Sequence, residues 1–243
     1  MSIKNFTLIE FEDIDSTNIY LKKMRAELPS LTVVSALYQS HGRGRLGRSF
    51  LSLKGKNLLF SILLKDDFAL QQHELLSLFV GYVLAKTLEK YHIESSIKWP
   101  NDVLINGKKT AGILLEGTAS EGKLDSVIIG IGVNINQEEF DPSFNATSLK
   151  KETGKEFDVD LVKNDFLEIF FDEYQKWIDN GPKFLDFIRE HNFYFNQEVN
   201  ANYKGEECSI KVLDILDNGH LEFILNGKKQ ESASLELTFH KNK

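Results

Sequence analysis

The chain has 243 residues, 42% of them hydrophobic, which is enough for one large domain, or for one large and one small domain. Its formal net charge of −7 argues against general binding to nucleic-acid backbones, which attract basic surfaces. The single cysteine, Cys208, rules out an intrachain disulfide framework, and the first residues lack the basic and then apolar pattern of a signal peptide, so we expect a cytoplasmic protein without a membrane anchor.

The first ninety residues predict strands, a long loop and a long helix. Strand patterns occupy residues 6–11, 31–38 and 57–64. Ser16 or Thr17 can cap a helix after the first strand. Residues 71–91 repeat apolar pairs at helical spacing, which predicts a helix with one wide face on the core. Residues 40–56 are rich in glycine, arginine, serine and lysine, and we expect them to form a loop.

The middle of the chain predicts a run of antiparallel strands. Strand patterns occupy residues 95–100, 102–105, 110–118 and 126–136. Asn106-Gly107 and Glu121-Gly122 are suited to the left-handed positions of tight hairpin turns. Because strands and helices are mixed without strict βαβ alternation, we expect an α+β domain with a mixed, mostly antiparallel sheet and packed helices.

The last third of the chain predicts helices followed by a small β domain. The apolar spacing beyond Asp158 indicates a long amphipathic helix, and Pro182 is well placed to open a shorter one. After about Asn192, short alternating strands separated by glycine turns are typical of a small β-barrel. We therefore expect a large domain over residues 1–191 and a small one over residues 192–243.

Three arginines and three glycines fall within residues 42–49 of this acidic chain. Each guanidinium offers a fixed fork of donors for a carboxylate or phosphate, and glycine lets a ligand approach the backbone. A solvated basic turn is the alternative, but the close spacing of the arginines favours an anion site. The letters also match the dinucleotide fingerprint and almost match the phosphate loop. Both of those patterns need a helix directly after the glycines, and no helical period follows here, so both are rejected.

Other polar positions are ambiguous when taken singly. Asn101 and Asp102 follow Pro100 in a turn that is either structural or able to serve a nucleotide and its Mg²⁺. Lys109 is either a solvated hairpin lysine, like Lys108, or a cation that stabilises phosphoryl charge.

Three further features can each be explained by a structural role. The glycines and asparagines of residues 130–136 indicate a bulge or a close approach to ligand. Residues 15–18, with the letters DSTN, fit a helix N-cap, which is compatible with binding as well. Cys208 is expected to be a buried structural thiol rather than a nucleophile. The histidines show no metal-ligand spacing.

The chain resembles the biotin–protein ligase family in motifs that occur in one order. They are DSTN at 15–18, Gln39 followed by GRGRLGR, KWPND at 98–102, Lys109 in KTAGILLE, and GIGVNIN at 130–136. These motifs cover roughly residues 15–136, and the helical and small β-barrel tail also matches the family. The resemblance implies a ligase domain similar to class II synthetases, followed by an SH3-like barrel.

The resemblance implies the activity of an ATP-dependent, AMP-forming biotin–[acetyl-CoA-carboxylase] ligase. Such an enzyme makes biotinyl-5'-AMP from biotin and MgATP and then transfers biotin to a lysine of a biotin carboxyl carrier domain. Mg²⁺ accompanies ATP, and its protein ligands are not assigned. Some members carry an N-terminal helix-turn-helix, but only fourteen residues precede DSTN here, so we expect no DNA binding. A monomer and a homodimer both stay open.

The resemblance also assigns roles to individual residues. The implied biotin-binding residues are Ser16, Thr17, Asn18, Gln39, Arg43, Gly44, Arg45 and Lys109. The implied ATP-binding residues are Arg48, Asn101 and Asn134. Lys109 and Arg45 carry the catalysis, because cations must offset the repulsion between a carboxylate and an anionic phosphate. We expect the arginine loop to become ordered over the reaction intermediate.

Two other functions compete with this interpretation. A lipoate or octanoate ligase or transferase would share the architecture and the type of acceptor, although the GRGRLGR and KWPND pair favours biotin. A biotin-binding regulator without catalytic activity would keep the pocket, but the presence of Lys109 and all three loop arginines argues against it.

Overall fold

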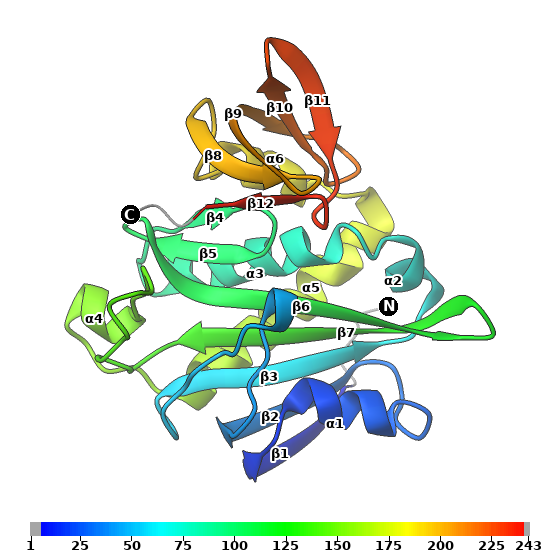
Figure 1. Cartoon of the computed structure of the whole chain (residues 1–243). Helices are drawn as coiled ribbons and strands as arrows, with labels where there is room; N and C mark the ends of the chain where they lie inside the picture. The colour runs from blue at the N-terminus through cyan, green and yellow to red at the C-terminus, as the bar shows by residue number, and fades with distance from the viewer. Residues whose placement is uncertain (1–5, 241–243) are drawn as a thin grey trace.

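The computed structural model describes residues 6–240, in which helices and strands are mixed along the chain (Figure 1). The strands are β1 (Thr7–Ile14), β2 (Thr32–Gln39), β3 (Asn57–Leu64), β4 (Ser96–Lys98), β5 (Asp102–Ile105), β6 (Lys108–Ser120), β7 (Lys123–Asn134), β8 (Glu198–Tyr203), β9 (Glu206–Ile215), β10 (Leu221–Leu225), β11 (Lys228–Ser232) and β12 (Leu237–Phe239). The helices are α1 (Thr17–Met24), the 3₁₀ turn η1 (Arg45–Gly47), α2 (Asp67–Gln71), α3 (Leu76–Lys90), α4 (Leu149–Thr153), α5 (Val159–Asn180) and α6 (Phe184–Glu190). The start of the chain, on which the expectation of no signal peptide partly rests, lies outside the described residues.

Seven strands form one mixed sheet in the order β1-β2-β3-β7-β6-β5-β4. Within the described residues, β1 and β2 pair in parallel, and the other neighbouring strands pair antiparallel. The hairpin turns form where they were predicted, since Asn106, Gly107, Glu121 and Gly122 all have positive φ angles. The α+β prediction with a mostly antiparallel sheet is confirmed.

Strand β3 is buried at every position because both faces of the sheet are covered around it. On one face Phe60 and Ile62 join the large core, which α3 and α5 complete. On the other face Leu63 packs with Leu21 of α1. Figure 1 shows α3 and α5 on one side of the sheet, and α1 and the loop between β2 and β3 on the other. The arginine loop therefore lies on the face that the long helices leave free.

The helix predicted over residues 71–91 is confirmed as α3, but the predicted start was wrong, because α3 begins at Leu76 and Gln71 is the last residue of the short α2. The Asp66 side chain accepts a hydrogen bond from the Ala69 amide at 2.9 Å, which gives the short α2 its own cap. A turn then leads to Leu76, where α3 begins. The long helix predicted beyond Asp158 is confirmed as α5, and the Asp158 side chain caps it. Among the described residues, no helix has both the length and the apolar character that a membrane span requires.

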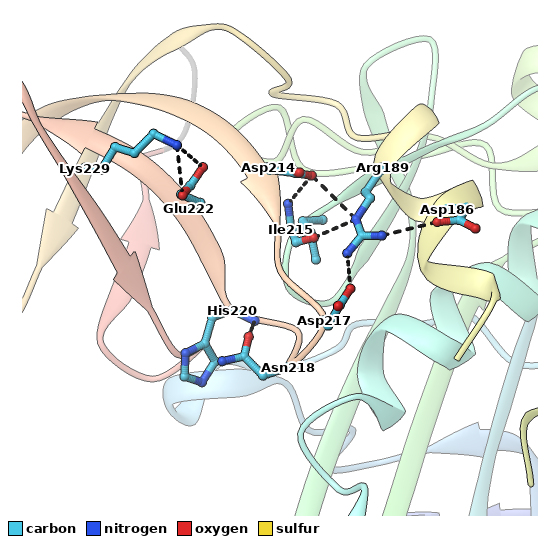
Figure 2. Close-up of polar contacts among 9 residues, drawn as sticks. All are labelled: Asp186, Arg189, Asp214, Ile215, Asp217, Asn218, His220, Glu222 and Lys229. Atoms are coloured by element: carbon cyan, nitrogen blue, oxygen red, sulfur yellow. Dashed lines mark hydrogen bonds and ion pairs between the residues drawn. The ribbon is translucent and has the colours of Figure 1, made fainter. Parts of the chain in front are cut away.

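The last five strands form a separate antiparallel sheet in the order β11-β10-β9-β8-β12, as expected for the small C-terminal domain. Figure 2 shows how Arg189 of α6 attaches to this sheet: it donates to the Ile215 carbonyl at 2.8 Å and pairs with Asp217 at 2.6 Å. The buried Trp99 Nε1 donates to the Gly219 carbonyl at 3.0 Å. Both contacts hold the small sheet against the large domain.

Candidate functional site

A pocket opens where segments that are far apart in the sequence meet on the face opposite the long helices. Its walls come from the start of α1, the end of β2, the arginine loop, and the strands β6 and β7. The predicted site residues that line it are Ser16, Thr17, Asn18, Gln39, Arg43, Gly44, Arg45, Asn101 and Lys109. The fold thus brings into one pocket residues that belong to separate motifs along the sequence.

The inner end of the pocket is polar and buried. The Thr17 amide donates to Gln39 Oε1 at 2.8 Å, so the side chain of Gln39 is held by the first turn of α1. The hydroxyls of Thr17 and Ser61 lie 2.6 Å apart, and Ser61 donates to Asn18 Oδ1 at 2.5 Å. Thr17, Asn18 and Ser61 are at most 3% exposed. Buried polar groups linked in this way have fixed directions, as recognition of a polar ring requires.

Ser16 occupies the N-cap position of α1, but its side chain makes no capping hydrogen bond. The prediction of a capping side chain is therefore wrong, although the helix does start where the motif indicated. Ser16 is 2% exposed and lines the pocket instead.

Three glycines in β6 and β7 make the floor of the pocket, and each leaves room for a particular neighbour. A Cβ atom at Gly130 would lie 2.3 Å from Asn18 Oδ1. A Cβ atom at Gly132 would lie 2.7 Å from the Phe50 ring, and one at Gly112 would lie 2.9 Å from Lys109 Nζ. The close approach that GIGVNIN suggested is therefore made by side chains of the protein itself, which Gly130 and Gly132 admit.

The arginine loop reaches both sides of the pocket mouth. Arg43 pairs with Glu116 of β6 at 3.0 Å. Arg45 donates to Asn101 Oδ1 at 3.0 Å and to the Ser234 carbonyl, just after β11, at 2.5 Å. Burial lowers the pKa of Arg45, which Asp102 partly offsets. A partly desolvated guanidinium at a pocket mouth favours an anionic ligand.

Lys109 also lines the pocket, at the start of β6, with its Nζ 2.6 Å from Asp102 Oδ1. Asp102 begins β5 directly after the KWPND turn, so the two motifs meet through this ion pair. Lys98, in the same turn, has a pKa lowered by burial. Arg43, Arg45 and Lys109 therefore lie at the mouth, and two carboxylates, Glu116 and Asp102, pair with Arg43 and Lys109. Cations arranged in this way suit a phosphate-bearing substrate.

Comparison with known proteins agrees with this geometry. A model of the biotin/lipoate A/B protein ligase family matches residues 10–134, about half of the chain. The bifunctional ligase/repressor BirA of Bacillus subtilis is 39% identical over 217 residues, which are 86% of this chain and 67% of that protein. The chain belongs to the biotin/lipoate A/B protein ligase family. The biotin–[acetyl-CoA-carboxylase] ligase of Paracoccus denitrificans is 32% identical over 171 residues, covering 67% of this chain and 69% of its own.

A solved structure extends the likeness over nearly the whole fold. The biotin protein ligase of Aquifex aeolicus, in complex with biotin and ATP, superposes with a TM-score of 0.82 at 30% identity. The match covers 97% of this chain and 99% of that one. The small C-terminal sheet is thus part of an architecture that this family member shares with a structurally known ligase.

Two predicted residues lie outside the lining of the pocket. Arg48 is exposed and lines a neighbouring hollow under the arginine loop. Asn134, at the end of β7, is buried, and its amide donates to the Thr147 carbonyl at 3.0 Å. A role for either residue in binding nucleotide stays a prediction.

Several residues of the site were missed from the sequence, among them Ser61, Phe50, Glu116 and Ser234. Glu116 could have been predicted from the sequence. Alternate residues of a strand point to the same face, so Glu116 of β6 shares the face of Gly112 and Leu114, which line the pocket. No local sequence pattern around Phe50 or Ser234 indicates that either residue reaches the site. The contact between Arg45 and Ser234 spans 189 residues of chain, and no local pattern predicts it.

Proposed function

We propose that this protein is a biotin–protein ligase that activates biotin with MgATP and transfers it to a lysine of a biotin carboxyl carrier domain. The observation that carries the proposal is one pocket with a buried polar end at Thr17, Asn18 and Gln39, and with Arg45 and Lys109 at its mouth. Biotin has the same polarity, with a cyclic urea at one end and a carboxylate at the other.

The first step joins two anions. The biotin carboxylate attacks the α-phosphorus of ATP, the bond to the bridging oxygen breaks, and pyrophosphate leaves. Lys109 and Arg45 lower the barrier by offsetting the charge of both reactants as they approach. Mg²⁺ enters with ATP and neutralises phosphate charge. Asp102, which already binds Lys109 at 2.6 Å, keeps that ammonium at the mouth of the pocket.

The second step releases AMP. The uncharged amine of the acceptor lysine attacks the carbonyl carbon of biotinyl-5'-AMP, the bond to the phosphate oxygen breaks, and the amine gives up a proton. The acceptor side chain reaches the mixed anhydride through the pocket mouth. We assign this chemistry to a catalytic domain over residues 1–191, assisted by the small domain over residues 192–243. A cytoplasmic location fits the use of ATP.

The buried end of the pocket favours biotin over lipoate. A dithiolane ring offers no strong hydrogen-bonding groups, so lipoate would leave Thr17, Asn18 and Gln39 facing an apolar ligand. Sites built to hydrogen-bond a ligand reject analogues that lack the matching groups, because their own buried polar groups lose partners. A urea supplies one acceptor and two donors to the same residues.

The decisive experiment weighs an acceptor domain after incubation with the chain, MgATP and either biotin or lipoate. We expect the mass increase of one biotinyl group with biotin and no increase with lipoate. Lipoylation would replace biotin by lipoate as the substrate. Biotin binding without ATP–pyrophosphate exchange would instead indicate a regulator without catalytic activity.

A further inference from the structure

Glu116 of β6 joins two parts of the pocket wall that are distant in sequence. Its Oε2 accepts a hydrogen bond from Asn18 Nδ2 at 2.9 Å, and its Oε1 pairs with Arg43 Nη1 at 3.0 Å. The Glu116 side chain is 14% exposed. Each carboxylate oxygen therefore has one donor of its own.

The contact with Glu116 decides which way the Asn18 amide points. An ionised carboxylate only accepts hydrogen bonds, so Asn18 must turn its Nδ2 toward Glu116. Its Oδ1 then faces Ser61, which donates at 2.5 Å, and the pocket floor at Gly130. Asn18 is only 3% exposed, so water cannot readily replace a lost partner.

We propose that Glu116 is a positioning residue that fixes the Asn18 amide so that the pocket presents an acceptor oxygen to the ureido N–H groups of biotin. The inference rests on the proposed function. Gln39 supplies the complement, because the Thr17 amide holds its Oε1 at 2.8 Å and leaves Nε2 as a donor for the ureido carbonyl. The pocket thus has one fixed acceptor and one fixed donor, as a cyclic urea requires.

The two contacts of Glu116 differ in how much free energy they contribute. The Arg43 side chain is 45% exposed, and ion pairs at such positions are screened by water and contribute little. Asn18 is buried, and a buried amide without its partner loses the full hydrogen bond and also its preferred orientation. Glu116 therefore acts on biotin through Asn18 rather than through Arg43.

Two substitutions at one position separate these effects. Glu116→Met keeps a side chain of similar length without an acceptor, and we expect the Kd for biotin, measured by calorimetry without nucleotide, to rise roughly tenfold. Glu116→Gln retains one acceptor oxygen for Asn18 while Arg43 turns to solvent, so its Kd should stay within about threefold of the wild type. Unchanged affinity in Glu116→Met, or equal losses in both variants, would overturn the inference.

Two control experiments test whether Glu116 acts through Asn18 and whether a similar substitution away from the pocket affects biotin binding. In an Asn18→Ala background, Glu116→Met should change the Kd by less than about threefold, whereas a second tenfold loss would contradict action through Asn18. Glu173 of α5 also bridges two donors, Tyr82 at 2.9 Å and Lys176 at 2.7 Å, and Glu173→Met should leave biotin affinity unchanged. A wild-type chain that does not bind biotin would refute the proposed function itself, whereas normal binding in Glu116→Met refutes this inference alone.

Discussion

Substitution of Gly132 by alanine tests whether the glycine floor of the pocket holds the arginine loop in place. The added methyl group would lie 2.7, 2.8 and 3.0 Å from three atoms of the Phe50 ring. Carbon atoms in contact prefer a separation of about 3.5–4.0 Å, so the ring must retreat by about 1 Å. The backbone itself accepts alanine, because Gly132 does not have a positive φ angle.

Movement of Phe50 would displace the residues that carry the charges. The Phe50 amide donates to the Gly42 carbonyl at 3.0 Å, and Arg43 forms a β-bridge with Ser49. A retreat of the ring therefore pushes on the loop that carries Arg43 and Arg45. A misplacement of about 1 Å at a reacting centre can reduce the rate on the order of 10²-fold.

The assay is biotin-dependent exchange of pyrophosphate into ATP, measured beside urea unfolding. We expect Gly132→Ala to lower exchange on the order of 10²-fold while the free energy of unfolding changes by less than about 1 kcal/mol. Gly81→Ala is the matched control, since a Cβ at this position of α3 meets nothing closer than 3.6 Å. That variant should gain about 0.5–1 kcal/mol of stability at unchanged exchange. Exchange within about threefold of wild type in Gly132→Ala would refute the reasoning.

Three further substitutions test separate parts of the structure. Lys109→Ala should reduce biotin-dependent exchange on the order of 10²-fold or more, whereas Lys108→Ala, whose partner is Glu152 at 3.2 Å, should change it by less than about twofold. Arg45→Lys should reduce exchange at least about tenfold with an unchanged unfolding temperature, because one ammonium group cannot replace the two hydrogen bonds of the guanidinium to Asn101 and to the Ser234 carbonyl. Full activity of this variant would show that the guanidinium of Arg45 is dispensable. Hydrogen bonds from Thr147 and Asn106 lower the pKa of Glu152 in the folded protein below its usual value of 4.5. The ionised Glu152 carboxylate therefore stabilises the fold above pH 4.5, and this stabilisation is lost as the pH falls through the lower pKa of the folded state. Glu152→Gln should therefore lower stability at neutral pH and flatten its decline below pH 4.5 in urea titrations, and an identical pH profile would contradict this assignment.

The secondary structure was largely predictable because it depends on local patterns. The hairpin at Asn106-Gly107 followed from residues that tolerate a left-handed backbone, and the long helix α5 followed from its apolar period. The start of α3 was not predictable. Residues 72–75 form a turn between α2 and α3, and the apolar spacing along the chain gave no sign of that break.

The chemical character of the site was also present in the sequence. Arginines and glycines concentrated in an acidic chain indicated an anion site, and the order of the motifs indicated the family. Those inferences needed only residue types and their spacing, because charge and hydrogen-bonding capacity belong to each side chain wherever it lies.

The partners within the site were decided by the tertiary structure alone. Asn18 and Glu116 are 98 residues apart, and Arg45 and Ser234 are 189 residues apart. Their contacts exist because β6 and β7 pair at the centre of the sheet and because the small C-terminal sheet packs near the arginine loop. The directions of the buried amides and the room above the glycines depend on distances between strands, loops and sheets, and a linear pattern carries no information about such distances.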